Sequence, residues 1–254
     1  MMRAATPLLL LTLSSALAAC SAAATSSQEG YLTRDQGKLW FKGELNEESV
    51  AHISAQLVKG DTLIINSGGG EQKSAIKLGN DIVDKGVTVS VNKRCHSACA
   101  LFVFAPAPSK EIMRGSYVWF HNSPAFWSAA LAASPRKISP AMAAAIRSND
   151  ASARALLKRA GVDWSVMTCI DNATGADPRA IGAASPASAL EDGEAPTAEL
   201  KYNFVSLSPS VMRQYGIIVE HDFEHDQSRQ SDESLNSYFD VKLKQVKNRS
   251  ECEA

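Results

Sequence analysis

The sequence predicts an α/β fold with a mostly parallel sheet. From about residue 39, short apolar runs typical of buried strands alternate with stretches long enough for helices. The clearest unit is Thr62–Asn66, a buried-type strand that is followed by three glycines and then by a helical stretch. Strands and helices that alternate at this spacing are joined by right-handed crossovers, which place the strands parallel to one another.

The expected elements have local signals at their ends. Asn46 can cap a first helix through its side chain, and two acidic residues follow it at the positive end of the helix dipole. Gly60 and Gly86 follow helical stretches and are expected to close them. Ser208 and Pro209 predict a short last helix, with the serine as cap and the proline at its first position. The expected strands are 39–41, 62–66, 87–91, 112–113 and 117–120, and the expected helices are 46–59, 71–85 and 208–216.

The second half of the chain gives weaker signals. The strands at 112–113 and 117–120 are expected to form a hairpin across the Arg114-Gly115 turn. Residues 124–168 are rich in alanine and predict helices, and residues 173–198 have the composition of a surface loop. Ile217-Ile218-Val219 is expected to add a last strand.

The first 20 residues have the layout of a secretory signal peptide. Arg3 precedes a short apolar core at Leu8–Leu13, and small residues lead to Cys20. The ending Leu17-Ala18-Ala19-Cys20 resembles the bacterial lipobox, in which the cysteine becomes the first mature residue and carries the lipid. An ordinary signal peptide cut after Ala18 or Ala19 is the alternative.

Four segments are therefore expected along the chain. Residues 1–19 form a lipoprotein signal peptide, residues 20–38 a flexible tether, residues 39–220 the folded domain and residues 221–254 a polar tail. No second apolar run in the sequence has the ~20 residues of a spanning helix. The lipobox resemblance implies that the protein lies in the cell envelope, anchored to the periplasmic side of a bacterial membrane through lipidated Cys20.

Charge and cysteine usage constrain the partners and the compartment. A formal net charge of −1 is not the footprint of a nucleic-acid-binding protein, so no nucleic-acid partner is expected. Four cysteines follow Cys20, and an exported chain meets an oxidising compartment in which two disulfides are plausible. Of the three possible pairings, the short spacing favours Cys95–Cys99, which leaves Cys169–Cys252 as the second bond.

Three features are expected at the carboxyl ends of neighbouring strands, where open parallel sheets form their sites. They are the Gly68-Gly69-Gly70 loop, Ser97 between its two cysteines, and His121. A serine hydroxyl needs an adjacent base to act as a nucleophile, and histidine is the commonest such base near neutral pH. A glycine turn and a helix start both offer backbone N–H groups to a developing oxyanion. Together they predict acyl-transfer chemistry.

Each feature also has a structural interpretation. A glycine run after a strand is often only a tight turn, a serine at a helix start is usually a cap, and a histidine at a strand end is usually structural. A thiol nucleophile at Cys95 or Cys99, and a Ser–Lys pair that uses Lys93 or Lys110, are alternatives to the Ser–His pair. His221 and His225 have the spacing of two metal ligands on a helix, but a solvated tail is the favoured interpretation, so no metal is expected.

The order of these features resembles the Clp-protease/crotonase-like superfamily, and in particular the Clp-type serine peptidases. The matching segments are 64–70, Ala75-Ile76, Ser97-Ala98, 119–122 and 207–217. The resemblance covers about 150 residues and implies a crotonase/Clp-like ββα superhelix with a mostly parallel sheet. Exported bacterial proteins of the same fold, with cysteines beside the serine, are similar too.

The resemblance implies roles for individual residues. Ser97 matches the nucleophile, His121 the general base, and the backbones of Gly69 and Ala98 the oxyanion donors. The family has an acid shortly before its last helix, and Asn203 is the nearest polar residue here. An asparagine can orient a histidine, although it carries no charge to stabilise the imidazolium. Gly68 stands where the family has a proline in the glycine loop.

Two functions follow from this comparison. The first is a serine peptidase or related acyl hydrolase that acts on peptide or protein substrates without a cofactor. The second is a non-catalytic binding or scaffold lipoprotein that keeps the fold, and the missing acid favours it. A crotonase that handles coenzyme A is a weaker third interpretation. Members of the superfamily commonly assemble into rings or trimers, so the resemblance also raises a homo-oligomer as a partner hypothesis, without fixing a stoichiometry.

Overall fold

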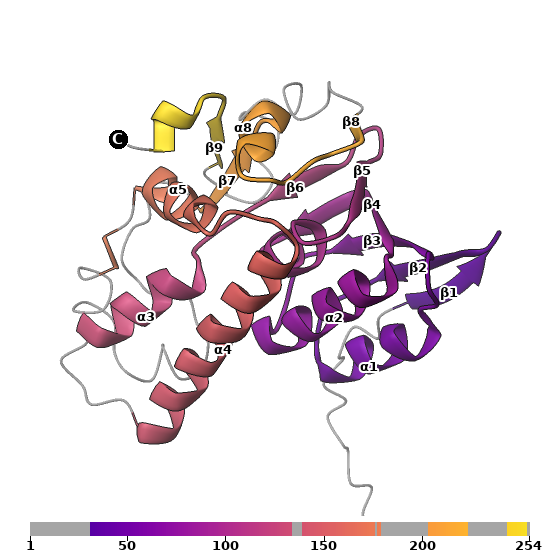
Figure 1. Ribbon diagram of the computed structural model, residues 1–254, viewed down its shortest axis with the longest axis horizontal. Coiled ribbons are helices and arrows are strands. Elements are labelled where there is room, and N and C mark those ends of the chain that lie inside the picture. The colour runs from indigo at the N-terminus through magenta and orange to yellow at the C-terminus, as the bar shows by residue number, and fades with distance from the viewer. Residues whose placement is uncertain (1–30, 134–138, 176, 179–202, 223–242, 253–254) are drawn as a thin grey trace, which may run out of the picture.

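The computed structural model describes residues 31–133, 139–175, 177–178, 203–222 and 243–252, so the signal peptide and Cys20 lie outside it. These residues form an α/β fold around a seven-stranded mixed sheet (Figure 1). The sheet has the order β1-β2-β3-β4-β5-β8, and β6 also pairs with β4. Its strands are β1 (Tyr31–Asp35), β2 (Lys38–Lys42), β3 (Thr62–Ser67), β4 (Thr88–His96), β5 (Ser109–Ile112), β6 (Tyr117–Trp119) and β8 (His221–Asp222).

Helices α1, α2 and α4 pack side by side, and the last described elements gather at the far end of the molecule (Figure 1). A second, two-stranded sheet joins β7 (Phe204–Leu207) to β9 (Leu243–Val246). The helices are α1 (Glu47–Gln56), α2 (Gln72–Lys85), η1 (Ala100–Phe104), α3 (Pro124–Ala133), α4 (Pro140–Arg159), α5 (Ser165–Thr174), α8 (Pro209–Gln214) and η2 (Arg249–Cys252).

The expected caps at Asn46, Gly86 and Ser208 are confirmed, but the expected closure of the first helix by Gly60 is wrong, because Leu57 is the C-cap of α1. Asn46 and Ser49 form a reciprocal capping box at the start of α1, although the helix ends at Gln56 rather than near residue 59. Gly86 closes α2 in the left-handed conformation. Ser208 caps α8, and its side chain accepts a hydrogen bond from the backbone N–H of Val211.

Parallel pairing carries the expected site residues to one edge of the sheet. The pairs β2–β3, β3–β4, β4–β5 and β4–β6 are parallel, and β1–β2 is antiparallel. Ser67 lies opposite Cys95, and His96 lies opposite Trp119. The glycine loop, Ser97 and His121 therefore follow β3, β4 and β6 at the same edge, which we call the carboxyl edge.

The apolar segment after Ser97 anchors this edge in the core. It forms the π-helical turn η1, and each of its five residues is at most 2% exposed. Gly79 of α2 allows this close packing, because a Cβ there would collide with the carbonyl oxygen of Phe102. Ser97 is thus attached to one of the most buried segments of the described chain.

The tether and tail expected from the sequence are both wrong in part. Tyr31–Asp35, inside the expected tether, forms the edge strand β1 and pairs with β2. Inside the expected tail, β8 pairs with β5, and β9 pairs with β7. Residues 217–219 form no strand. Most of the expected 173–198 loop lies outside the described residues.

The expected hairpin is also wrong, because β5 and β6 run in the same direction along β4. Ser109–Ile112 pairs with the first half of β4, and Tyr117–Trp119 pairs with its end. The segment between them therefore does not reverse the chain direction. In this segment the hydroxyl of Ser116 accepts a hydrogen bond of 2.8 Å from the backbone N–H of Lys93. Lys93 has a φ of 72°, so β4 is irregular at the same level.

Both disulfide bonds of the favoured pairing are present. Cys95–Cys99 brackets Ser97, with the two Cα atoms 5.3 Å apart. Cys169–Cys252 ties η2 to α5 across 83 positions, and Asn172 adds a hydrogen bond of 2.7 Å to the carbonyl of Cys252. The second bond explains why residues 243–252 belong to the folded domain.

Candidate active site

Ser97 occupies a strained turn between β4 and the helical segment that follows. Its φ is 55°, in the left-handed region that residues other than glycine avoid at a cost of about 1–3 kcal/mol. Its N–H donates to the carbonyl of Trp119 at 3.0 Å, and its own carbonyl accepts from the N–H of Leu101 at 3.0 Å. The Cys95–Cys99 bond closes the same turn. The surrounding contacts therefore hold the serine in this conformation.

His121 lies within hydrogen-bond reach of the serine. Its Nε2 is 2.5 Å from the Oγ of Ser97, although 24 positions separate the two residues. The ring of Phe204 packs edge-on against the imidazole, with centroids 5.3 Å apart. Burial lowers the pKa of His121 to about 4. The imidazole is therefore neutral at pH 7, the form that can accept a proton from a hydroxyl.

The glycine loop packs directly against the serine. Gly69 has a φ of 101°, and a Cβ there would lie 2.8 Å from the Cβ of Ser97 and 2.9 Å from the carbonyl oxygen of His96. Only glycine fits this position without displacing the neighbouring chain. The N–H of Gly69 donates to the buried hydroxyl of Ser67 at 3.1 Å, so it is engaged within the loop.

Ala98 offers the second expected oxyanion donor. It begins the helical turn after Ser97, and no described residue accepts a hydrogen bond from its N–H. The same nitrogen would lie 3.2 Å from a Cβ placed on Gly69, so the loop and the helix start lie next to one another. Of the two expected donors, the one at Ala98 is open in this structure and the one at Gly69 is occupied.

The chain around Asn203 passes beside His121, as the resemblance requires for a third residue. Phe120 and Val205 exchange two backbone hydrogen bonds of 2.7 and 2.8 Å, which dock β7 against the residue before His121. Asn203 immediately precedes β7 and its side chain is partly buried. This docking brings the segment expected to supply the third residue to the site.

Two carboxylates that the chain could have folded toward His121 have other partners. Asp171 accepts hydrogen bonds from the N–H of Ser123 at 2.8 Å and from its hydroxyl at 2.5 Å. Burial raises the pKa of Asp171 to about 6, although the two hydrogen bonds from Ser123 act to lower it. Asp163 accepts from the N–H of Ser165 at the start of α5. Asp171 thus fixes Ser123, which lies two positions after the histidine and directly before α3.

The alternative nucleophile and base have less support. Cys95 and Cys99 are joined in a disulfide, so neither has a free thiol. Lys110 lies opposite Val89, eight positions before Ser97 on β4, and its ammonium donates to the carbonyl of Ala107. At about 3.3 Å per strand residue, this places Lys110 far from the serine. The side chain of Lys93 is exposed.

His96 is a part of the site that the sequence analysis missed. The residue is 8% exposed, and its ring stacks on Trp119 at 4.7 Å between centroids, with an interplanar angle of 9°. Burial, assisted by the charge of Arg94, lowers its pKa to about 3. Its Nε2 has no hydrogen-bond partner among the described residues. Its place opposite Trp119 in a parallel pair is the signal that could have revealed this stacking.

A cleft of about 440 Å³ opens on the other side of the glycine loop. Its walls come from the ends of the first four strands and from the segment after β2. The lining residues are Tyr31, Lys42, Gly43, Glu44, Asn66, Gly68, Gly69, Gly70 and Arg94. Gly69 lines this cleft and also touches Ser97, so the cleft adjoins the candidate nucleophile.

The described residues carry neither a metal-binding cluster nor a candidate membrane span. They contain no group of three or more side chains suited to a metal ion, and His221 lies in the strand β8 rather than on a helix. None of the described helices has both the length and the apolar character that a membrane span needs. In comparisons with known proteins, no family model and no curated protein matches the chain.

Proposed function

We propose that the protein is a serine hydrolase of the Clp-protease/crotonase-like type, which cleaves peptide or acyl bonds through Ser97 and His121. The distance of 2.5 Å between Oγ of Ser97 and Nε2 of His121 carries the proposal. The strained backbone at Ser97 supports it, because such conformations persist where the surroundings enforce them and are common at active sites. The mostly parallel sheet and the position of the residues at its carboxyl edge agree with the same fold.

The proposed reaction proceeds in two stages. Oγ of Ser97 attacks the carbonyl carbon of the substrate while Nε2 of His121 takes the hydroxyl proton. The N–H of Ala98 stabilises the oxyanion, and Gly69 becomes the second donor once its N–H leaves the hydroxyl of Ser67. The intermediate collapses, the leaving amine or alcohol takes the proton from His121, and water then hydrolyses the acyl-enzyme with the same base.

Asn203 is proposed as the residue that orients His121. Its segment is docked beside the histidine through the Phe120–Val205 pair. An amide can fix the ring, but it does not stabilise the imidazolium as a carboxylate does, so turnover should be slow. An Asn203→Asp variant should therefore hydrolyse an activated ester faster than the wild type.

A non-catalytic binding protein is the second candidate. The bond between the N–H of Gly69 and the Ser67 hydroxyl favours it, because this bond occupies one expected oxyanion donor. Under this interpretation the same fold binds a peptide or protein at the carboxyl edge without turning it over.

We also propose that the protein acts in the cell envelope, anchored through a lipid on Cys20. Two disulfides in the described domain are typical of proteins that fold in an oxidising compartment. Growth with an alkyne-bearing palmitate should label the wild type and leave a Cys20→Ser variant unlabelled. Labelling of both proteins would contradict anchoring at this cysteine.

A fluorophosphonate probe tests the hydrolase proposal, because it reacts with activated serines. We expect the wild type to be labelled, and mass spectrometry to place the adduct on Ser97. Ser97→Ala and His121→Ala should abolish labelling, whereas Ser116→Ala should leave the rate unchanged. Folded wild-type protein that takes no label would remove the hydrolase proposal and leave the binding protein.

A further inference from the structure

A row of four side chains crosses the carboxyl edge beside the glycine loop. Tyr31 lies opposite Lys42 in the β1–β2 pair, and Lys42 lies opposite Asn66 in the β2–β3 pair. Asn66 precedes Ser67 on β3, and Arg94 precedes its partner Cys95 on β4, where the register of the two strands shifts and both residues reach the same cleft. All four line the cleft of about 440 Å³, so the row forms one wall of a single cavity.

The spacing of this row suits a small anionic group. Neighbouring strands lie about 4.8 Å apart, so Lys42 and Arg94, two strands apart, begin roughly 10 Å from one another. The amide of Asn66 lies between them. Long side chains from both positions can reach a carboxylate held over the middle strand, and a guanidinium can bind both of its oxygens.

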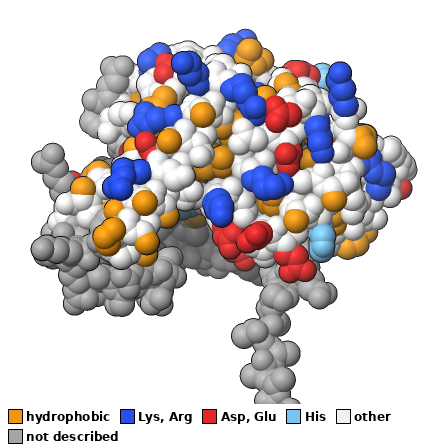
Figure 2. Space-filling model, turned by 60° about the horizontal axis from the view of Figure 1, so that its bottom comes forward, with side chains coloured by type: hydrophobic (Ala, Val, Ile, Leu, Met, Phe, Trp, Pro, Cys, Tyr) orange, Lys and Arg blue, Asp and Glu red, His pale blue; other side chains and the backbone are white. Residues whose placement is uncertain are grey.

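Both cations of the row are available to a ligand. Lys42 and Arg94 are exposed and form no ion pair with another described residue. Elsewhere, cations and acids are interspersed over the surface shown in Figure 2, and Lys77, for example, pairs with Asp81 on the same helix. Glu44 is the one acid that lines the cleft, so the lining carries a net charge of +1.

The floor of the cleft is part of the candidate active site. It consists of Gly68, Gly69 and Gly70, which have no side chains to fill the space. Gly69 lies on the cleft and packs on Ser97 from the other side. A substrate whose scissile carbonyl reaches Ser97 can therefore place a neighbouring residue in the cleft.

We propose that this cleft binds a single carboxylate of the substrate, and that the protein prefers acidic peptides. The inference rests on the proposed hydrolase function for its link to cleavage, but the binding step stands without it. Lys42 and Arg94 supply the charge, and Asn66 donates its amide N–H. Glu44 opposes a second acidic group, so peptides with one acidic residue should bind better than strongly acidic ones.

The test measures binding directly. Fluorescent hexapeptides with capped ends, identical except for one central Glu or Gln, are titrated into the wild-type protein by anisotropy, and mass spectrometry verifies that the peptides stay intact. We expect the Glu peptide to bind roughly tenfold more tightly, as a charge-assisted hydrogen bond allows. Lys42→Gln and Arg94→Gln should remove this preference, and Lys59→Gln, another exposed lysine, should keep it.

Equal binding of the two peptides, or binding of neither, would overturn the inference. A Gln peptide with a free C-terminal carboxylate separates the two sources of the anion, because its tight binding would assign the cleft to chain ends rather than side chains. The fluorophosphonate assay reports separately on Ser97. Labelling without a Glu preference removes only the cleft proposal, and a Glu preference without labelling removes only the hydrolase.

Discussion

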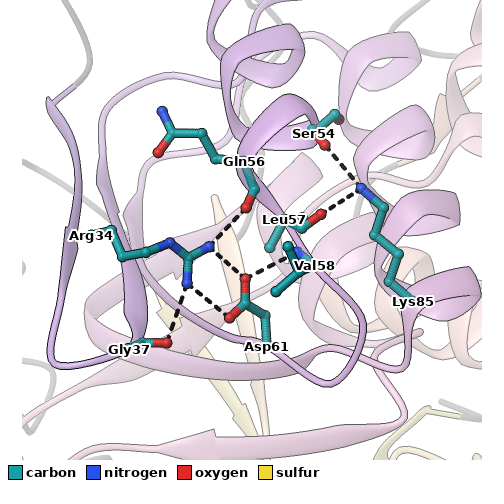
Figure 3. Close-up of polar contacts among 8 residues, drawn as sticks. All are labelled: Arg34, Gly37, Ser54, Gln56, Leu57, Val58, Asp61 and Lys85. Atoms are coloured by element: carbon teal, nitrogen blue, oxygen red, sulfur yellow. Dashed lines mark hydrogen bonds and ion pairs between the residues drawn. The ribbon is translucent and has the colours of Figure 1, made fainter.

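The two ends of the parallel strands differ in how they use their polar groups. At the beginning of β3 and β4, which we call the amino edge, Arg34 forms two hydrogen bonds of 2.7 and 2.9 Å with Asp61 (Figure 3). The guanidinium also donates to the carbonyls of Gly37 and Gln56, and Asp61 accepts from the N–H of Val58. These charged groups are therefore paired within the protein.

Lys85 extends this network to the end of α1. Its ammonium donates to the carbonyls of Ser54 and Leu57 at 2.9 and 2.8 Å, where the helix has no internal donors left (Figure 3). One cluster thus joins β1, α1 and α2 at the amino edge. Its geometry is that of a structural clamp.

The carboxyl edge shows the opposite pattern. Ser97 has a strained backbone, the N–H of Ala98 has no acceptor among the described residues, and the Nε2 of His96 has no partner there either. His96 and His121 are both held neutral by burial. The same strands are therefore stabilised by paired charges at one end, whereas the other end carries backbone strain and unpaired polar groups.

The largest expected effect on the carboxyl edge comes from adding a methyl group to the glycine loop. In Gly69→Ala the new Cβ lies 2.8 Å from the Cβ of Ser97, on a residue with a φ of 101°. We expect a loss of about 3 kcal/mol of stability and a loss of fluorophosphonate labelling of more than ~100-fold.

Gly60→Ala is the matched control at the amino edge. Gly60 has a φ of 76°, but nothing lies within 4 Å of its Cβ position. It should lose only about 1 kcal/mol to backbone strain and label at the wild-type rate. Chemical denaturation and labelling kinetics measure both effects. Equal behaviour of the two variants would mean that the loop is not packed against the serine.

Breaking the clamp should destabilise the protein without changing the site. In Asp61→Asn the buried side chain that accepts the hydrogen bonds of Arg34 loses its charge. We expect the free energy of unfolding to fall by about 1–2 kcal/mol. The labelling rate of Ser97 should stay within twofold of the wild type. A loss of labelling in folded Asp61→Asn protein would show that the two edges are coupled.

The strand–loop–helix order could be predicted from local sequence signals. The pairing of Ser97 with His121 could be predicted because parallel strands joined by right-handed crossovers end at the same edge of the sheet. The apolar run before Gly68 and the left-handed closure at Gly86 mark the crossover, and right-handed crossovers bring the strand ends together. The short spacing of Cys95 and Cys99 predicted the first disulfide, and Cys169–Cys252 was the pair that remained.

Other features depend on distant partners that the sequence does not reveal. No residue of Tyr31–Asp35 is buried and its exposure does not alternate, so its strand is recognised only from its pairing with β2. β9 pairs with β7 across about 40 positions, and a disulfide at Cys252 follows it. The bond between Gly69 and Ser67 depends on the rotation of a hydroxyl, which no pattern of residues specifies.

As the pH is lowered, the carboxyl edge should lose its contribution to stability at a higher pH than the amino edge does. The pKa values of His96 and His121 are lowered to about 3 and about 4, so between pH 6.5 and 4 the unfolded chain binds these protons and the folded protein does not. Stability should therefore fall as the pH drops through this range. Asp171, with its pKa raised to about 6, binds a proton in the folded state and offsets part of the loss.

Asp61 at the amino edge affects stability only at a lower pH than the two histidines do. Its pKa is lowered chiefly by the hydrogen bond from Arg34, so its contribution is complete above its ordinary value of 3.8 and is lost only at lower pH. His96→Phe, which can keep the stacking on Trp119, should flatten the fall of stability between pH 6.5 and 4. Denaturation curves at several pH values measure this slope. An unchanged slope would contradict the assignment of the acid sensitivity to the buried ring.

Ser67→Ala gives the smallest expected effect and the finest test of the carboxyl edge. The hydroxyl accepts the N–H of Gly69 at 3.1 Å and is buried, so its removal should cost about 1 kcal/mol of stability. It also frees the N–H for an oxyanion, and we expect labelling of Ser97 to rise roughly two- to fivefold, the value of one weak hydrogen bond. Ser74→Ala, another nearly buried serine whose hydroxyl donates to Glu71, is the control and should leave the rate unchanged. A fall in labelling would mean that Ser67 supports the loop rather than competes with the substrate, and the difference between the two edges would then be one of strain alone.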